Sequence, residues 1–328
     1  MLEAARAGEF TGLTLSAADG QPVLTAGDDR LGPVGPDFTD VAGRVRWMDA
    51  RSIAEQWVSP WLDLLNWHRF GGTATRRWVA MVNDALADAA CDSGGRLRAV
   101  PAVDLSAGAT VAADDVTSLA ERFAPPAVLL STHPAGLNSV ADPSLGPLWA
   151  RLATLGMPVL LHPPGNGPAQ AFTPPVLQNV AGRLLDTSSA VSQLMASGVF
   201  ERLPALRVIV VHGGAILPYQ IFRLDGLVRA GLLARTGMTE PPSAVLRRLF
   251  FDTVALDGLS IEFLARRVGH GQILLGSDAP FPIADPDPVG TVGAAGLTAD
   301  AERAICDGNA RSLAWQTGRD QGAGTSIR

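Results

Sequence analysis

The sequence contains no lysine: all 26 basic residues of the 328-residue chain are arginine. Without a lysine side chain, Schiff-base chemistry, the anchoring of pyridoxal phosphate and the lysine of a phosphate-binding P-loop are excluded. The carbamylated lysine that bridges the metal ions of two-metal hydrolases is excluded as well. The composition therefore removes several classes of enzyme before any motif is considered.

Positive charge, cysteine and long apolar runs are also scarce. The 26 basic residues are outnumbered by 32 acidic ones and form no basic run, which argues against nucleic-acid binding. The two cysteines, Cys91 and Cys306, are too far apart in sequence to suggest a disulfide framework or a zinc knuckle. No apolar run approaches the roughly 18 residues that span a membrane, and residues 1–10 lack a signal-peptide pattern. We therefore expect a cytoplasmic protein that binds neither nucleic acid nor a membrane.

Seven short β-type runs alternate with helical patterns along the chain. The runs are apolar on both faces, as in a parallel sheet covered by helices, and comprise residues 58–64, 97–105, 127–132, 158–162, 206–212, 249–254 and 272–277. Their spacing predicts an α/β fold, a TIM-like (β/α)8 barrel that lacks its first strand. An open doubly wound sheet is the alternative, and it is disfavoured because no G-x-G-x-x-G motif follows an early strand.

One barrel domain is expected over residues 1–315. Within it, residues 11–26 predict a small β-hairpin insertion, because Asp19-Gly20 is a turn signal between two short strands. Residues 316–328 are polar and Gly-rich, which is typical of a flexible tail. Eight strands are needed to close the barrel, so the missing strand is expected before Met1. An upstream natural start is favoured over a genuinely shortened barrel, since a lost strand leaves two unpaired sheet edges.

Three strands end in a side chain that can bind a metal ion or carry a proton. His162 and His212 each end an apolar run, and Asp278 directly follows another. In a parallel barrel these strand ends meet at one mouth, where imidazole and carboxylate groups can converge on a divalent ion. Each residue alone is more often structural, so the prediction depends on the set. His133, which follows a fourth run, is a further candidate for the same pocket.

Six ordered blocks of the chain resemble the amidohydrolase superfamily, in particular its aminocarboxymuconate-semialdehyde decarboxylase-like branch of metal-dependent nonoxidative decarboxylases. The strongest are GVFERLPALRVIVVHGGAILP at 198–218 and QILLGSDAPFP at 272–282. RVRWMDA, PVLLHPP, FFDTVALD and DGNARSLA support them. The resemblance runs from Gly43 to Trp315 and therefore covers most of the chain.

This resemblance implies a role for each matching residue. His162 and Asp278 match metal ligands, with zinc as the expected divalent ion, and Asp278 also belongs to the catalytic set. His212 matches the acid/base group, and Arg223 matches an arginine that holds a substrate carboxylate across a homodimer interface. His133 is taken as a second substrate-binding residue. The implied reaction is decarboxylation of a small aromatic or dienoic carboxylic acid.

Some residues of this chain depart from the family pattern. No H-x-H motif, the source of two further metal ligands, is present. Pro164 replaces an aromatic residue, and Leu24 and Leu256 stand where an arginine and a histidine are expected, which argues against the semialdehyde as substrate. Two alternatives therefore stay open. One is a metal-dependent hydrolase of a lactone, ester or amide, and the other is a non-catalytic barrel with an incomplete metal site.

Overall fold

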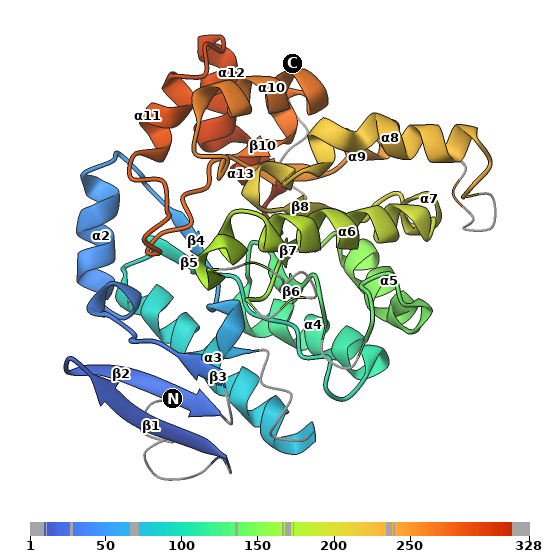
Figure 1. The fold of residues 1–328 in the computed structure, drawn as a ribbon. Helices are drawn as coiled ribbons and strands as arrows, with labels where there is room; N and C mark the ends of the chain where they lie inside the picture. Colours follow the sequence, from blue (N-terminus) through green and yellow to red (C-terminus); the bar gives the residue numbers. More distant parts are fainter. Residues whose placement is uncertain are drawn as a thin grey trace, which may run out of the picture.

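Parallel strands in chain order form the centre of the molecule (Figure 1). The computed structural model describes residues 10, 12–26, 29–65, 72–134, 137–165, 167, 172, 174–233, 238 and 240–316. A five-stranded parallel sheet consists of β6 (Val128–Ser131), β7 (Val159–His162), β8 (Val208–Val210), β9 (Phe250–Asp252) and β10 (Ile273–Leu274). β4 (Gln56–Val58) pairs in parallel with β5 (Leu97–Ala99), and a bridge between Ala102 and Leu129 connects this pair to β6.

The strand order from β4 to β10 is that of a (β/α)8 barrel with one strand missing. Six of the seven sequence runs contain one of these strands, and the first run, at 58–64, overlaps β4 only at Val58. In the described part of the chain, no strand pairs with the free side of β4 or of β10. The gap in the barrel therefore lies between the first and the last parallel strand, where the sequence predicts it.

The first parallel strand differs from the sequence prediction. Residues 58–64 were expected to be extended, but β4 ends at Val58 and Leu62–Leu64 form the short 3-10 helix η2. Pro60 explains the difference, because proline cannot donate a hydrogen bond to a strand ladder and restricts the residue before it. The chain therefore turns over the barrel mouth, and Trp61 and Asp63 reach the cavity region described below.

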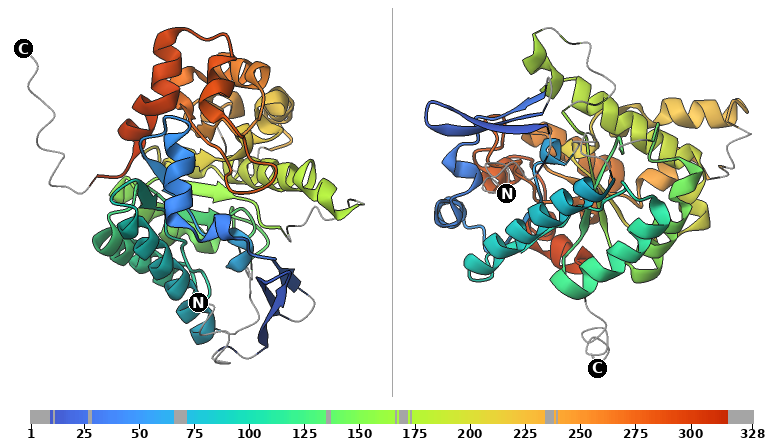
Figure 2. Two further views of the ribbon diagram at one scale, coloured as in Figure 1. Left: turned by 90° about the vertical axis from the view of Figure 1, so that its left-hand side faces the viewer. Right: turned by 90° about the horizontal axis from the view of Figure 1, so that it is seen from below.

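Helices follow the strands and surround them, as the view from below in Figure 2 shows. They are α3 (Gly72–Asp92), α4 (Ala109–Phe123), α5 (Gly146–Leu155), α6 (Gly182–Ala196), α7 (Val199–Arg202), α8 (Leu217–Arg229), α9 (Pro242–Leu246), α10 (Gly258–Val268), α11 (Pro288–Gly293), α12 (Ala299–Arg303) and α13 (Asn309–Leu313). Shorter turns include η1 (Pro36–Phe38), η4 (Pro143–Leu145), η5 (Pro175–Asn179), η6 (His212–Gly214), η7 (His270–Gln272) and the π-helical η8 (Ala304–Gly308). None of the helices in the described ranges is long and apolar enough to cross a membrane.

An N-terminal sheet packs beside the barrel. β1 (Leu13–Ala18) and β2 (Gln21–Ala26) pair antiparallel across the turn at Asp19 and Gly20, and β3 (Asp29–Leu31) pairs with β2. Helix α2 (Val41–Asp49) then leads to β4. Leu24 is fully buried and belongs to an apolar cluster with Trp78 of α3, which attaches the hairpin to the barrel. The predicted tail lies outside the described residues, apart from Gln316.

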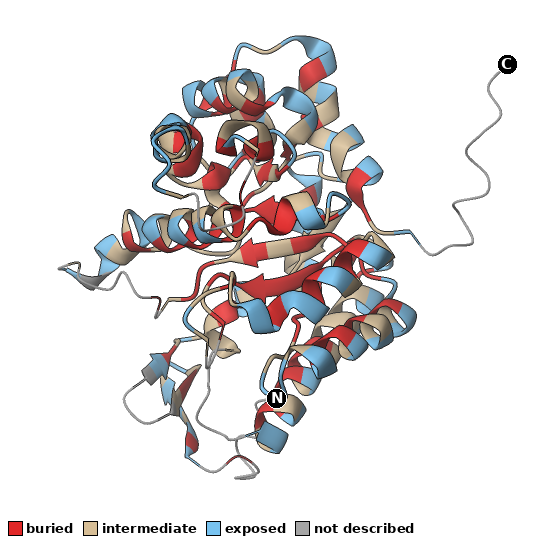
Figure 3. Cartoon of the chain, turned by 90° about the vertical axis from the view of Figure 1, so that its right-hand side faces the viewer, coloured by how far each residue is buried: buried red, intermediate tan, exposed pale blue. Residues whose placement is uncertain are grey.

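The strands contribute to two apolar clusters on opposite faces. Outward-facing side chains such as Leu161 and Phe251 pack against the helices. Ile209, Leu274 and Leu129 belong to a smaller cluster inside the barrel. Figure 3 shows the same pattern, with buried strands and helices that are exposed only on their outer sides. Both faces of the sheet are therefore covered, which explains why its strands are apolar throughout.

Candidate metal centre

The structure brings three predicted residues together at the carboxyl ends of the strands. His162 ends β7, His212 begins η6 directly after β8, and Asp278 follows β10. Each offers a ligand atom, and these atoms lie within 4.8 Å of one another. The two imidazole rings have centroids 5.2 Å apart and meet edge to face. The set is therefore close enough to bind a single ion.

A hydrogen bond to the backbone orients the imidazole ring of His162. Its Nδ1 lies 2.8 Å from the Pro163 carbonyl oxygen, which can only accept, so Nδ1 carries the proton and donates it. The lone pair of Nε2 is then available for a metal ion. Burial, together with the positive charge of Arg183, lowers the pKa of His162 to about 4. The imidazole is therefore neutral near pH 7, as metal binding requires.

His212 depends on an unusual backbone turn. It has φ 58°, and the following Gly213 and Gly214 also have positive φ, so the chain reverses sharply after β8. The Asp252 carboxylate at the end of β9 accepts a hydrogen bond of 2.8 Å from the Gly213 N–H and stabilises this turn. Burial and the neighbouring His162 lower the pKa of His212 well below its ordinary value. Its Nδ1 is buried and has no hydrogen-bond partner in the described structure.

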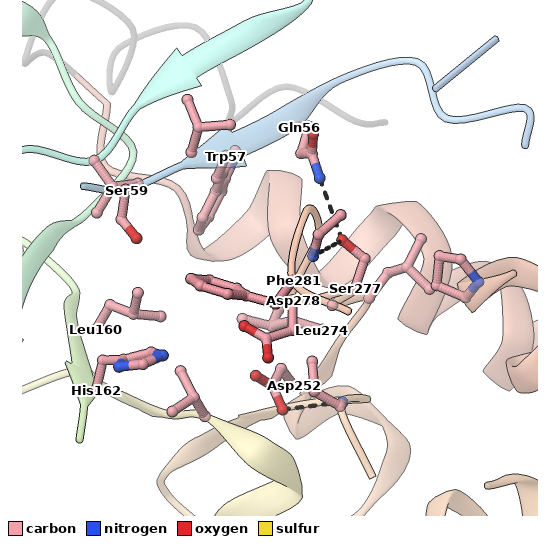
Figure 4. A pocket seen from close by; sticks show the side chains of 18 of the residues that line it. Gln56, Trp57, Ser59, Leu160, His162, Asp252, Leu274, Ser277, Asp278 and Phe281 are labelled. Carbon is pink, nitrogen blue, oxygen red and sulfur yellow. Dashed lines mark hydrogen bonds between the residues drawn. The ribbon is translucent and has the colours of Figure 1, made fainter. Parts of the chain in front are cut away.

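Two acidic side chains face His162 across the cavity in Figure 4: Asp278 and Asp252. Burial and, to a smaller extent, the charge of Asp252 raise the pKa of Asp278 to about 7, while Arg183 acts in the opposite direction. Burial also raises the pKa of Asp252 to about 6, although backbone N–H donors oppose this. A divalent cation would relieve the repulsion between the carboxylates. Two neutral imidazoles and a carboxylate are also a donor set that zinc accepts, so the residues fit a metal ion.

The cluster lies in a cavity of about 2600 Å³ inside the barrel. Trp61, Phe38 and Phe281 pack together on its wall, with ring centroids 5.2 to 5.4 Å apart. Residues of β4 and β10, the two strands that border the gap, also line the cavity. The Gln56 side chain donates to Ser277 Oγ at 3.3 Å across this gap (Figure 4). A closed barrel fills its interior with side chains. The absence of a strand between β4 and β10 among the described residues therefore explains why this interior is so open.

The remaining predicted residues lie elsewhere. Arg223 is exposed on α8 and does not line the cavity. His133 follows β6 and is half-buried, and it is not among the residues that line the cavity. His270 is exposed in η7, as expected for a connection, and His68 lies outside the described residues. A role for Arg223 across a subunit interface stays a prediction.

The sequence analysis missed three charged residues near the centre: Asp252, Arg183 and Asp63. Asp252 ends β9, but it lies inside the predicted run at 249–254, so the strand-end criterion applied to the sequence did not identify it. Arg183 at the start of α6 forms an ion pair with Asp63, with Nη2 and Oδ2 3.3 Å apart. These two residues are 120 positions apart, and no pattern in the sequence indicates their pairing.

Comparisons with known proteins identify a family and several relatives. A family model described as amidohydrolase matches residues 25–313. A 2-amino-3-carboxymuconate-6-semialdehyde decarboxylase of Dictyostelium discoideum is 29% identical over 168 residues, which are 50% of this chain and 45% of that protein. A 6-methylsalicylic acid decarboxylase of Penicillium expansum is 29% identical over 164 residues, or 49% of each protein. A 2-keto-4-carboxy-3-hexenedioate hydratase of a Sphingobium species is 28% identical over 142 residues, or 43% of this chain and 39% of that protein. The chain thus spans about half the length, or less, of these curated relatives.

Solved structures share the fold over most of the chain. IDCase of Metarhizium anisopliae, in apo form, matches with a TM-score of 0.77 at 23% identity, covering 92% of this chain and 90% of that one. The 5-carboxyvanillate decarboxylase of Novosphingobium aromaticivorans, solved with manganese and 4-hydroxy-3-methoxy-5-nitrobenzoic acid, matches with a TM-score of 0.71 at 19% identity, covering 85% and 84%. These likenesses confirm the predicted α/β barrel fold.

Proposed function

This chain belongs to the amidohydrolase family, and from that premise we propose that it is a metal-dependent nonoxidative decarboxylase. Its substrate would be a small aromatic or dienoic carboxylic acid, in line with relatives named as decarboxylases of such acids. The observation that carries the proposal is the convergence of His162, His212 and Asp278 on one point of a large cavity. A hydratase among the relatives supports an alternative in which water is added to the substrate.

The chemistry assigns a separate task to each residue. His162, through Nε2, and Asp278 would hold the metal ion, which when bound supplies Lewis-acid stabilisation of developing negative charge. The bond between the carboxyl carbon and its neighbour breaks, CO2 leaves, and the electron pair remains on the substrate carbon. His212 would take a proton from solvent at a ring nitrogen and transfer it to that carbon, since its lowered pKa makes the protonated imidazole a strong acid. Trp61 and Phe281 would exclude water and pack against an aromatic substrate.

The identity of the metal is a separate part of the proposal. Zinc is expected because the imidazole of His162 and the carboxylate of Asp278 are ligands that it accepts. The manganese in the 5-carboxyvanillate decarboxylase makes that ion the second choice. Elemental analysis of the purified chain after saturation with each ion would distinguish them, and about one ion per chain is expected for the preferred metal. An amount far below one would favour a non-catalytic barrel.

A homodimer is also proposed, on the basis of an apolar surface beside the cavity. Tyr219 and Phe222 of α8 are exposed, and Arg267 lies over the rings of Phe222 and Phe263. An exposed aromatic patch of this kind is typical of an interface. Arg223 lies on the same helix, so in such a dimer its side chain would reach toward the cavity of the neighbouring subunit. Light scattering should give the mass of a dimer, and Phe222→Glu should shift it to that of a monomer.

The decisive experiment measures CO2 release. The full chain, loaded with zinc or manganese, would be incubated with 6-methylsalicylate, 5-carboxyvanillate and related acids. We expect metal-dependent CO2 release from at least one acid, with a loss of at least about a hundredfold in His212→Asn, since a positioned acid/base group contributes roughly 10²–10⁴. His270→Asn is the control. Products of hydrolysis or hydration without CO2 would overturn the proposal in favour of the alternatives.

A further inference from the structure

A half-buried guanidinium that no part of the proposed chemistry uses lies beside the candidate metal centre. Arg183 lines the cavity, and its side chain is only 20% exposed. Its positive charge acts on the whole cluster, because it lowers the pKa of His162, His212 and Asp278. A half-buried arginine that lines a cavity needs an explanation, since partial burial of a charge is costly unless its donors find acceptors.

Three hydrogen bonds hold this guanidinium in one position. Nε donates to Asn179 Oδ1 at 2.9 Å, Nη1 donates to the Pro163 carbonyl oxygen at 3.1 Å, and Nη2 donates to Asp63 Oδ2 at 3.3 Å. Asp63 itself also accepts from the Gly165 N–H and from Trp61 Nε1. The fork is therefore positioned by a network of neighbours and does not swing freely.

The same network leaves donors for a ligand. A guanidinium has five N–H donors, and the described structure accounts for three of them, so Nη1 and Nη2 each retain one. Two neighbouring N–H groups of an arginine fork match the two oxygens of a carboxylate. The unused donors therefore favour an anionic, planar acceptor.

An acceptor bound by Arg183 would lie on a different side of His162 from the metal ion. The Pro163 carbonyl oxygen accepts from Nη1 of Arg183 and from Nδ1 of His162. Arg183 thus approaches the imidazole from its Nδ1 side, whereas the ligand atom Nε2 is at the other end of the ring. A group bound by Arg183 is consequently a different part of the substrate from the group bound at the metal centre.

The energetics of decarboxylation also favour a group that stays on the product as the partner of Arg183. A strong ion pair with the carboxylate that leaves as CO2 would stabilise the bound substrate and would be lost in the transition state, which slows the reaction. An ion pair with a carboxylate that stays on the product persists throughout and contributes to binding and orientation. Taking the proposed decarboxylation as the basis, we infer that Arg183 determines specificity by binding a second, retained carboxylate, so that the substrate is a dicarboxylic acid.

The test compares a diacid with its neutral isostere. Isophthalate and 3-carbamoylbenzoate share one carboxylate and differ only in whether the second group is a carboxylate or an amide. Binding to the metal-loaded full chain would be measured by calorimetry for the wild type, Arg183→Gln and Arg183→Lys. The matched control is Arg96→Gln, because Arg96 donates to the carbonyls of Ala54 and Ile53 and pairs with Asp49, but lies outside the cavity lining.

The wild type and Arg96→Gln should bind isophthalate about tenfold to a hundredfold more tightly than 3-carbamoylbenzoate, the range of a charge-assisted hydrogen bond. Arg183→Gln should abolish this preference and leave the affinity for 3-carbamoylbenzoate within about threefold, which a merely structural role would not do. Arg183→Lys, which keeps the charge without the fork, should retain part of the preference.

Two results would overturn the inference: a wild type without the preference, or an Arg183→Gln variant that keeps it. If Arg183→Gln does not fold, Arg183→Lys serves as the test, and an undiminished preference in that variant is then the contrary result. Because binding is measured without turnover, the test is independent of decarboxylation. A chain that releases no CO2 but shows the preference would contradict the proposed function alone.

Discussion

Individual side chains at the barrel mouth are held toward their neutral forms by burial. Asp278 and Asp252 are carboxyl groups whose pKa values are raised by burial, and the charge of Asp252 adds to the effect on Asp278. Burial also favours the neutral forms of His162 and His212, and here it lowers the pKa because the protonated imidazole is the charged form. The four groups together form a site in which the unliganded state carries an electrostatic cost.

The electrostatic cost of ionising Asp278 predicts that Asp278→Asn stabilises the metal-free chain at high pH. The folded pKa of Asp278 is about 7, against 3.8 for an ordinary aspartate. Between these values the unfolded chain ionises while the folded chain stays protonated, so the free energy of unfolding falls as pH rises through this window. Asparagine is isosteric with the protonated aspartate and does not ionise, so it removes this decrease in the free energy of unfolding. In a chelator, we expect Tm to rise by about 2–5 °C at pH 8 and to be unchanged at pH 4. A lower Tm of the variant at pH 8 would contradict this reasoning.

A second prediction at this scale concerns metal affinity. His162→Ala should weaken zinc binding by at least about tenfold to a hundredfold, because it removes a ligand whose orientation is set by the Pro163 carbonyl. Competition with a chromogenic chelator would measure the effect. His270→Ala is the control, since His270 is exposed in η7. Equal affinity of the two variants would exclude His162 as a ligand.

Among the single elements of the fold, the turn after β8 has the conformation that depends most on residue identity. Gly214 has φ +77°, and a Cβ at this position would lie 2.7 Å from a ring carbon of Phe251. The η6 turn can therefore carry His212 toward the cavity only if glycine occupies this position. The same sequence signal that predicted a strand end, VIVVHGG, also contains the residues that the turn requires.

Gly214→Ala should lower the free energy of unfolding by about 2–4 kcal/mol, because positive φ and overpacking both oppose the new methyl group. Gly231→Ala is the matched control: its φ is +73°, but nothing lies within 4 Å of the added Cβ, so only the conformational cost of about 1 kcal/mol is expected. Urea denaturation of both variants measures the difference. Equal destabilisation would show that packing against Phe251 is unimportant.

Across the whole molecule, the open side of the barrel determines how stability is distributed. β7 and β8 are paired on both sides, whereas β4 and β10 each have one free side in the described structure. Gln56 N–H donates to Arg96 O in the direction of β5, so the next amide, that of Trp57, points toward the gap. Sheet edges are also the places where another segment can pair.

Hydrogen exchange should therefore be slowest in the middle of the sheet. We expect the amides of Leu160 and Leu161 in β7 to exchange at least about a hundredfold more slowly than that of Trp57, since the strand edge opens more readily than the core. Exchange followed by NMR or by mass spectrometry of short peptides would measure this. Equally slow exchange at Trp57 would mean that the gap is closed in solution.

The sequence by itself determined the parallel α/β class, the family and the three residues that converge at the barrel mouth, since strand-end patterns depend on neighbouring residues in the chain. Seven apolar runs and the ends at His162, His212 and Asp278 were sufficient for this. Only the tertiary structure decided the end of β4 and the place of Arg183 beside Pro163 and Asp63. Contacts between residues a hundred positions apart depend on how the strands and loops are arranged in space, and no local pattern records that arrangement.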